Sequence, residues 1–388
     1  MNALKRLELR KFVAPEFVFG LDARLLAGRY AKNYGARKVL IVTDPGIISA
    51  GCVDDVISSL DVEGVKYSVF SDVHPNPRAE EVMNGAKKYN DEGCNVIIAV
   101  GGGSPIDCAK GIGLVTSNEK YILEFEGVDQ VSLPGPPLIC IPTTAGSSAD
   151  VSQFAIINDT MRKVKIAIIS KMVVPDVALI DPLTLKTMSP YLTACTVMDS
   201  LTHAIEAFVS NAQSSITDIH ALEAIKLISN NLIPAIRKPG DIEVLGEIMM
   251  ASLHAGIAFS NASLGAVHAM AHSLGGFLDH PHGECNAILL KYVINYNFDS
   301  AAIRYKAIGE AMGLNLEAKK PYKIKENLFD YITNLQETIG INRTLGDLGV
   351  FPNYIPELAA KSLRDPCIAT NPRIPNSKDI EVIYEQAL

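Results

Sequence analysis

Short apolar runs alternate with stretches of amphipathic helical periodicity in the first half of the chain. The runs, each of which we predict to be a strand, are KVLIVTD (38–44), VKYSVF (65–70), NVIIAVGGG (95–103), LICIPTTAG (138–146) and VALIDP (177–182). Helical patterns near 46–60 and 77–91 separate the first three runs. This alternation predicts βαβ units with right-handed crossovers and a parallel, Rossmann-like sheet. Residues 154–169 (FAIINDTMRKVKIAII) predict a hairpin that turns at 159–163.

The periodicity changes beyond Pro182 and becomes helical almost without interruption to the end of the chain. At 388 residues the chain exceeds the size at which a single core usually keeps growing. We therefore expect two domains. One is an α/β domain at 1–185, and the other is an all-helical domain at 186–388.

Composition favours a compact soluble enzyme. Charged residues make up 20% of the chain and hydrophobic residues 48%. The formal net charge is −8 and no block of Lys or Arg occurs, which argues against nucleic acid or an anionic membrane as a partner. We expect no bilayer span, because no apolar run in this pattern reaches the necessary length, and the start of the chain lacks the apolar core of a signal peptide.

The seven cysteines are scattered and form no CxxC pair, which is typical of reduced thiols in the cytoplasm. We therefore expect a cytoplasmic protein. The apolar segment FVAPEFVFG (12–20) is a candidate for pairing across a homodimer or a higher homo-oligomer.

The clearest candidate chemistry is a concentration of histidines in the helical half. Asp199 and His203 are four residues apart in a helical pattern, so their side chains point from one face. His268, His272 and His282 follow within fifteen residues, although the chain holds only 8 histidines. Each histidine alone is more simply a hydrogen-bonded core residue. Together, one carboxylate and several imidazoles indicate a site for iron(II), zinc, manganese or nickel, and the absence of thiolates argues against a closed structural zinc site.

The ligand set that we choose is Asp199, His203, His268 and His282. Spacing does not force this choice, because His268 and His272 also stand four residues apart and form an alternative helical pair.

A glycine-rich loop follows the strand at 95–100. Gly101, Gly102 and Gly103 precede Ser104, a predicted N-cap, and Pro105, the predicted first helical residue. Glycines allow a phosphate to approach the backbone, and a helix N-terminus favours its charge. The loop differs from GxGxxG, and the alternative is a tight strand-to-helix turn.

Two more segments point to a dinucleotide. Asp44 ends a predicted strand, where a carboxylate can accept hydrogen bonds from ribose hydroxyls and repel a 2′-phosphate, so NAD is favoured over NADP. The alternative is an ordinary turn aspartate before Pro45. Thr143, Thr144 and Ser147 offer hydroxyls to a pyrophosphate or a nicotinamide, or simply cap a helix. We expect the active site between the two domains, where ligand sites are common.

Six blocks resemble the iron-dependent (group III) alcohol dehydrogenases, and most closely their 1,3-propanediol and short-chain primary alcohol dehydrogenase branch. They are GGGSPIDCAKGIG (101–113), IPTTAGSSADV (141–151), MDSLTHAIEAF (198–208), GAVHAMAHSLGG (265–276), PHGECNAILL (281–290) and TNPR (370–373). The resemblance implies a metal-dependent, reversible hydride transfer between a small alcohol or aldehyde and NAD. It also implies two domains, an α/β dinucleotide-binding domain at 1–185 and an all-helical metal-binding catalytic domain at 186–388, in an architecture that is similar to that of dehydroquinate synthase.

The resemblance implies roles for individual residues too. The metal, iron(II) or alternatively zinc, falls on Asp199, His203, His268 and His282, and His272 lies beside it, close to nicotinamide and substrate, as a candidate proton relay or positioning residue. The implied cofactor positions are Asp44, Asn76, Gly101, Gly102, Gly103, Ser104, Asp107, Thr143, Thr144, Ser147, Ser152 and Lys165. The chain departs from the family pattern at Val197, Ser200, Asp150, Glu284 and Cys285. Glu284, beside a metal ligand, is the departure that can change the polarity of the substrate pocket.

Two other functions compete with this one. A lyase or cyclase of the dehydroquinate synthase type needs basic side chains near the metal, but segments 198–210 and 261–290 contain no Arg and only Lys291 stands at their edge. A non-catalytic protein that binds metal and nucleotide is the third hypothesis. The sequence does not identify which alcohol is the substrate.

Overall fold

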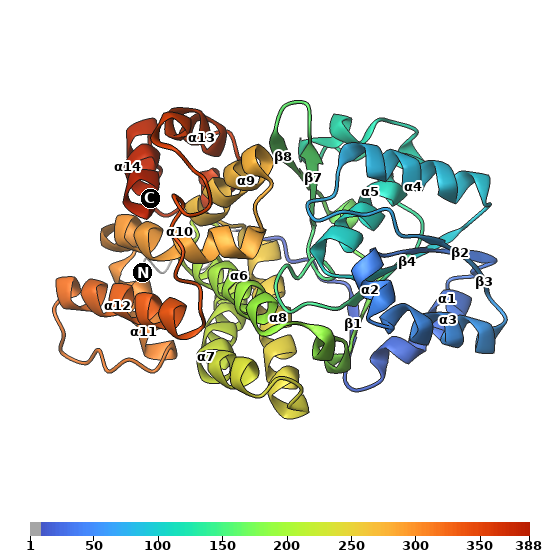
Figure 1. Cartoon of the computed structure of the whole chain (residues 1–388), viewed down its shortest axis with the longest axis horizontal. Helices are drawn as coiled ribbons and strands as arrows, with labels where there is room; N and C mark the ends of the chain where they lie inside the picture. Colours follow the sequence, from blue (N-terminus) through green and yellow to red (C-terminus); the bar gives the residue numbers. More distant parts are fainter. Residues whose placement is uncertain (1–8) are drawn as a thin grey trace. The chain divides into compact units, whose positions relative to one another are not determined.

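The computed structural model describes residues 9–388, which form two compact units (Figure 1). One unit is Ala14–Met188, and the other contains Ser189–Leu388 together with the described residues that precede Ala14. The division of the chain into domains at residue 185 stays a prediction.

The unit Ala14–Met188 is built on a parallel sheet of six strands. In spatial order the strands are β1 (Glu16–Phe19), β9 (Val177–Ile180), β6 (Leu138–Pro142), β4 (Val96–Gly101), β2 (Lys38–Val42) and β3 (Lys66–Phe70). The central strands are continuous apolar runs because helices cover both faces of the sheet. The predicted parallel sheet is thus confirmed.

Side chains that alternate along β2 separate the two faces of this sheet. Val39 and Ile41 pack into a cluster with the helices α1 and α3, whereas Leu40 and Val42 belong to a second cluster with α4 and α5. The helices of this unit are α1 (Ala27–Asn33), α2 (Pro45–Ser49), α3 (Cys52–Glu63), α4 (Ala79–Asp91) and α5 (Gly103–Asn118). Because helices cover both faces of the sheet, ligands of such folds bind at the carboxyl ends of the strands.

The predicted hairpin is also confirmed. Strands β7 (Phe154–Asp159) and β8 (Val164–Ile169) pair in antiparallel register, and the Asp159 carboxylate accepts hydrogen bonds from the turn at Met161 N and Arg162 N. The short strand β5 (Gly127–Val128) runs parallel to β8 and completes a three-stranded sheet.

Two local predictions were wrong. The helix expected near 46–60 is broken into α2 and α3, because Gly51 takes a left-handed conformation with φ +80°. The helix after the glycine loop begins at Gly103 with Gly102 as N-cap, so Ser104 is not the cap. Pro105 then lies inside the first turn, where its missing N–H leaves no intrahelical bond unmade.

The second unit is helical, as predicted. Its α-helices are α6 (Pro190–Val209), α7 (Ser215–Arg237), α8 (Ile242–Ala262), α9 (Ala266–Leu278), α10 (His282–Asn297), α11 (Ala302–Ala311), α12 (Pro321–Thr338), α13 (Ile355–Ser362) and α14 (Ser377–Ala387). Several begin at a side chain that accepts a hydrogen bond from the first turn, including Ser189 before α6, Ser214 before α7 and Asp241 before α8.

Helix α8 corrects the expectation that no apolar segment is long enough to cross a membrane. Its 21 residues pass that test by length and composition. However, 61% of its most apolar 18-residue stretch is buried inside the protein, and the helix packs against α6 and α7. These are the properties of a core helix in a folded domain.

The close contact between α1 and α3 leads to the first prediction. Gly28 in α1 lies so near α3 that an added Cβ would stand 2.0 Å from the carbonyl oxygen of Ser59. Gly28→Ala should therefore lower the free energy of unfolding by about 1–3 kcal/mol, the usual cost of overpacking. Urea denaturation measures this change.

Gly246 in α8 provides the matched control, because an added Cβ there meets no atom within 4 Å. Gly246→Ala should stabilise by up to about 1 kcal/mol through helix propensity. Equal effects of the two substitutions would show that contact with Ser59 is not the cause.

Candidate metal and cofactor sites

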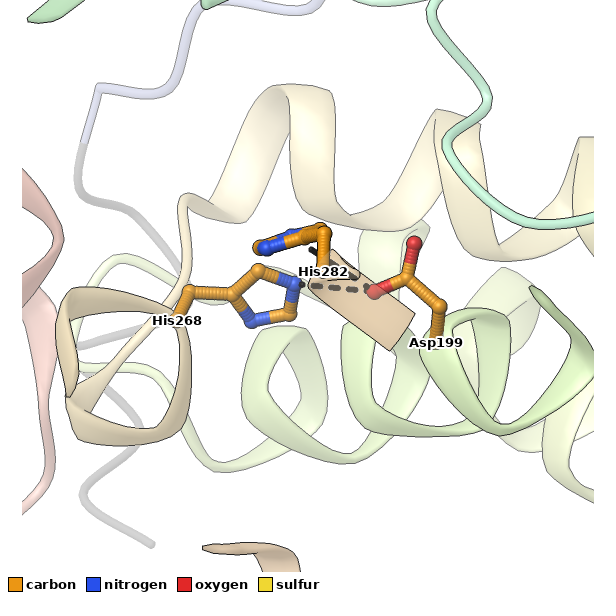
Figure 2. A group of neighbouring side chains, drawn as sticks. All are labelled: Asp199, His268 and His282. Atoms are coloured by element: carbon orange, nitrogen blue, oxygen red, sulfur yellow. Dashed lines mark ion pairs between the residues drawn. The ribbon is translucent and has the colours of Figure 1, made fainter. Parts of the chain in front are cut away.

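Three of the proposed metal ligands converge in the core of the helical unit (Figure 2). Asp199 comes from α6, His268 from α9 and His282 from the first turn of α10. The Oδ1 atom of Asp199 lies 3.6 Å from Nε2 of His268 and 3.7 Å from Nε2 of His282. One ligand atom from each residue lies within 4.8 Å of the other two. A single divalent cation can bind all three atoms.

A glycine beside His282 makes this convergence possible. A Cβ on Gly283 would stand 2.4 Å from the carbonyl oxygen of Cys195, one helical turn before Asp199. The start of α10 can therefore approach α6 closely only with glycine at this position. This approach brings His282 to Asp199.

His203 lies beside the cluster. Its Nε2 is 4.0 Å from Asp199 Oδ1, and its ring stacks between His268 and Phe259, with centroids 4.5 and 4.2 Å away. It is outside the compact three-residue group. Its assignment as the fourth ligand stays a prediction.

Burial and charge act against each other at this cluster. Burial alone would raise the pKa of Asp199, but His203, His282 and His268 lower it far below its usual range. Burial alone would lower the pKa of His268, but hydrogen bonds to Asp199 and Glu206 raise it overall, to about 9. A buried carboxylate that faces imidazole nitrogens fits a bound divalent cation, which would share its charge with all of them.

His272 lies outside the cluster, although spacing alone allowed it as a ligand. Its Nδ1 is 2.8 Å from Oδ2 of Asp365, and its ring stacks on His282 with centroids 5.1 Å apart. With Asp365 and Cys367 it forms a second group of possible ligand atoms. The rings of His268 and His272 thus both lie near His282, but only His268 has a ring nitrogen in the compact group with Asp199.

Sequence reasoning missed three polar residues at this site. The Nδ2 atom of Asn286 is 2.6 Å from Asp199 Oδ1, 3.2 Å from His268 Nε2 and 3.1 Å from His282 Nε2. Glu206 and Asp365 hold the Nδ1 atoms of His268 and His272.

Their signals in the sequence differ in strength. Asn286 stands four residues after His282, and Glu206 three residues after His203, so helical spacing would have found both. Asp365 is 93 residues from His272, and no local pattern predicts their contact.

Glu284, the departure from the family pattern, has partners of its own. Its buried carboxylate lies 3.3 Å from Nη1 of Arg343. Burial and a hydrogen bond with Glu284 raise the pKa of Tyr191 above its usual range. The charge of Glu284 is therefore paired with Arg343.

The predicted cofactor residues gather at the carboxyl ends of neighbouring strands in the other unit. Asp44 follows β2, the glycine loop follows β4, and Thr143 follows β6. Thr143 N donates to Gly101 O at 3.0 Å. A Cβ on Gly102 would lie 3.1 Å from the Thr144 side chain, and a Cβ on Gly103 2.9 Å from that of Ser147. This edge of a parallel sheet is where nucleotides bind.

Asp44 is the N-cap of helix α2, whereas the alternative was an ordinary turn aspartate. Its Oδ1 accepts a hydrogen bond from Ile47 N at the start of α2. One carboxylate oxygen thus has a structural role, which does not prevent the other from reaching a ribose.

A buried lysine joins two of the implied cofactor positions. Lys110 Nζ donates to Ser152 O at 3.1 Å and to Phe154 O at 2.6 Å, and lies 3.7 Å from Asp107 Oδ1. Burial raises the pKa of Asp107 to about 6 against the opposing charge of Lys110. Asp107 Oδ1 and Thr143 Oγ1 are two of the buried side-chain atoms in residues 9–388 that have no hydrogen-bond partner. Because buried polar atoms normally have a hydrogen-bond partner, these two atoms are suited to bind a polar ligand at the carboxyl edge of the sheet.

Asn76 and Lys165 come from segments that meet at the hairpin. Asn76 has a left-handed φ of +58° and precedes Pro77, whose carbonyl accepts a hydrogen bond from Asn158 N at 2.7 Å. Lys165 on β8 is the register partner of Asn158 on β7. Asn76 and Lys165 therefore belong to adjoining parts of the fold. Ser104, another implied cofactor position, lies in the first turn of α5.

Comparison with known proteins assigns the chain to a family. Residues 14–182 match the family described as iron-containing alcohol dehydrogenase, and residues 193–388 match the C-terminal part of the Fe-containing alcohol dehydrogenase family. The 1,3-propanediol dehydrogenase of Klebsiella pneumoniae is 38% identical over 95% of this chain and 96% of its own length. The NAD-dependent methanol dehydrogenase of Bacillus methanolicus is 34% identical over 97% of this chain and 99% of its own.

A crystal structure of a 1,3-propanediol oxidoreductase superposes with a TM-score of 0.95 and 37% identity, covering 98% of this chain and 100% of that one. Sequence and fold thus agree along nearly the whole length. The chain belongs to the iron-containing alcohol dehydrogenase family.

Proposed function

We propose that this alcohol dehydrogenase transfers hydride reversibly between a short-chain primary alcohol and NAD, with iron(II) held by Asp199, His203, His268 and His282. The observation that carries the proposal is the buried convergence of Asp199, His268 and His282, at 3.6 and 3.7 Å. Family membership favours this reaction over the lyase and non-catalytic alternatives. The donor set accepts zinc as well, so the preference for iron rests on the family.

When bound, the metal would supply a Lewis acid for the alcohol or aldehyde oxygen, and NAD would supply the hydride acceptor. The residues of the chain would hold and shield these groups. Asp199 and the imidazoles would hold the ion, and the surrounding helices would keep it from solvent. In oxidation, the carbinol carbon would lose hydride to the cofactor, and the hydroxyl oxygen would lose a proton that passes to solvent.

His272 is our candidate for carrying that proton. Its Nδ1 lies 2.8 Å from Asp365, which accepts the Nδ1 proton. Its Nε2 is then the nitrogen that exchanges a proton with the substrate. Its ring stacks against His282, the ligand with the most exposed side chain of the three in the compact group, at 25%.

The cofactor is expected at the glycine loop. Gly101, Gly102 and Gly103 would approach the pyrophosphate, with Ser104 and the start of α5 facing its charge. Hydroxyls of Thr143, Thr144 and Ser147 would bind the dinucleotide from the next strand. Asn76, Asp107, Ser152 and Lys165 complete the proposed site on the resemblance to the family.

We propose further that the protein is cytoplasmic and forms a homo-oligomer. All seven cysteines are buried free thiols. In the described part of the chain, β1 is the last strand at one edge of its sheet, which supports pairing with a second copy. Analytical ultracentrifugation of the intact chain tests this assembly. The alcohol is a small primary alcohol or diol, and a panel of aldehydes assayed with NADH identifies it.

The second prediction tests the ligand set. Asp199→Ala, His203→Ala, His268→Ala and His282→Ala should each lose bound metal and activity, because an ion held by four side chains is weakened severely when one is removed. Elemental analysis of protein reconstituted with iron(II) measures the metal, and circular dichroism checks the fold.

His272→Ala is the matched control and should keep its metal. A His282→Ala protein with its full complement of iron would contradict the ligand set. A metal-free His272→Ala protein would show that the wrong member of the His268 and His272 pair was chosen.

The third prediction concerns Asp44 and cofactor choice. Asp44→Gly removes a carboxylate that would repel a 2′-phosphate, so the ratio of kcat/KM for NADPH to that for NADH should rise at least about tenfold. Asp44→Asn should act similarly, because it removes the charge and preserves the cap on α2. An unchanged ratio in both variants would mean that Asp44 does not face the ribose.

The fourth prediction tests the relay. His272→Ala should keep metal and NADH binding but lose about 10²–10⁴-fold in kcat, as general acid–base residues do. Asp365→Asn should lower kcat as well, because an amide N–H facing Nδ1 would move the imidazole proton to Nε2. If His272 only positions substrate, KM should rise while kcat stays nearly intact.

A further inference from the structure

Glu206 is a buried carboxylate one helical turn beyond His203 on α6, and its side chain is only 3% exposed. It makes three contacts with the start of α9. Its Oε2 accepts from Gly265 N at 3.0 Å and faces His268 Nδ1 at 2.6 Å, and its Oε1 accepts from Val267 N at 2.7 Å. Both oxygens are thus engaged, and neither contacts Asp199 or His282.

These contacts determine where His268 carries its proton. Two of the three groups that face Glu206 are backbone N–H donors, so the side chain serves best as an ionised acceptor. The Nδ1 atom of His268 must then be the third donor. An imidazole that keeps its proton on Nδ1 can bind a metal only through Nε2, and Nε2 is the atom 3.6 Å from Asp199 Oδ1.

The same contacts attach α9 to α6. The N-cap of α9 is Gly265, which has no side chain to satisfy the first N–H groups of the helix. Glu206 accepts two of these groups from a different helix, and Asn371 Oδ1 accepts a third from Ala266 N at 3.1 Å. The helix that carries His268 is therefore fixed to the helix that carries Asp199.

We propose that Glu206 is a positioning residue for the metal: it keeps the proton of His268 on Nδ1, aims Nε2 at the ion and thereby sets the affinity of the site. The proposal rests on the ligand set of the proposed function. Glu206 itself is not a ligand, because its oxygens are occupied by donors from α9.

The test is the zinc dissociation constant of the full-length Glu206→Gln protein, measured by competition with a chromophoric chelator. Glutamine has nearly the same shape, but its NH₂ group donates where the carboxylate accepts. An NH₂ group facing Nδ1 favours the imidazole with its proton on Nε2, the nitrogen that has to bind the metal. Zinc affinity should fall about 10–100-fold, the usual effect of removing such a partner.

Asn371→Ala is the matched control, because Asn371 caps the same helix without touching His268. It should lower the melting temperature of the metal-free protein and leave the zinc dissociation constant unchanged. Glu206→Asp retains an acceptor-only carboxylate, so it should bind zinc more tightly than Glu206→Gln. It also serves as the second variant if Glu206→Gln fails to fold.

These measurements test the role of Glu206 separately from the assignment of the metal ligands. Zinc binding by Glu206→Gln as tight as in the wild type overturns the role of Glu206, as does an equal loss of affinity in Asn371→Ala or in Glu206→Asp. If His268→Ala also binds zinc like the wild type, the ligand set itself is wrong. Loss of affinity in His268→Ala and Glu206→Gln, with Asn371→Ala unaffected, supports both.

Discussion

The buried carboxylate of Asp199 is the constraint on which the helical unit depends. A charge that is taken out of water needs compensating partners, and Asp199 is only 4% exposed. Its partners come from α9 and α10 as well as from its own helix, so compensation of one charge requires three helices to meet. The same requirement explains a cation site: imidazole lone pairs and a carboxylate that face one point are best satisfied by a shared positive ion.

The packing of α6, α9 and α10 against one another depends on further residues around Asp199. Gly283 removes the side chain that would keep α10 from α6, and Glu206 supplies the acceptors that α9 lacks at its own N-terminus. Asn286 adds a donor that faces the Oδ1 atom of Asp199 at 2.6 Å. Gly283 and Asn286 lie on α10 and Glu206 lies on α6, and each acts through a contact with another helix.

The sequence predicted what depends on local periodicity and spacing. Continuous apolar strands, the hairpin at 154–169 and the helical half follow from patterns of two and 3.6 residues, and the Asp199 and His203 pair follows from one helical turn. The break at Gly51 was missed because an amphipathic pattern persists across a left-handed glycine. The choice between His268 and His272 could not be made from spacing, since both lie on α9 and both rings lie near His282; only the contact of His268 with Asp199 on α6 separates them. The contact of His272 with Asp365 depends entirely on tertiary structure.

Glu284 illustrates why a departure from a family pattern has to be judged by its partners. In the sequence, a carboxylate two residues after a metal ligand indicates a more polar substrate pocket. In the fold, that carboxylate is buried and lies 3.3 Å from Arg343, with a further hydrogen bond involving Tyr191. A charge that is paired in this way adds no net charge to its surroundings, and breaking the pair would cost more than its presence does. The departure at 284 is therefore compensated by Arg343 and Tyr191, and it adds no unpaired charge beside His282.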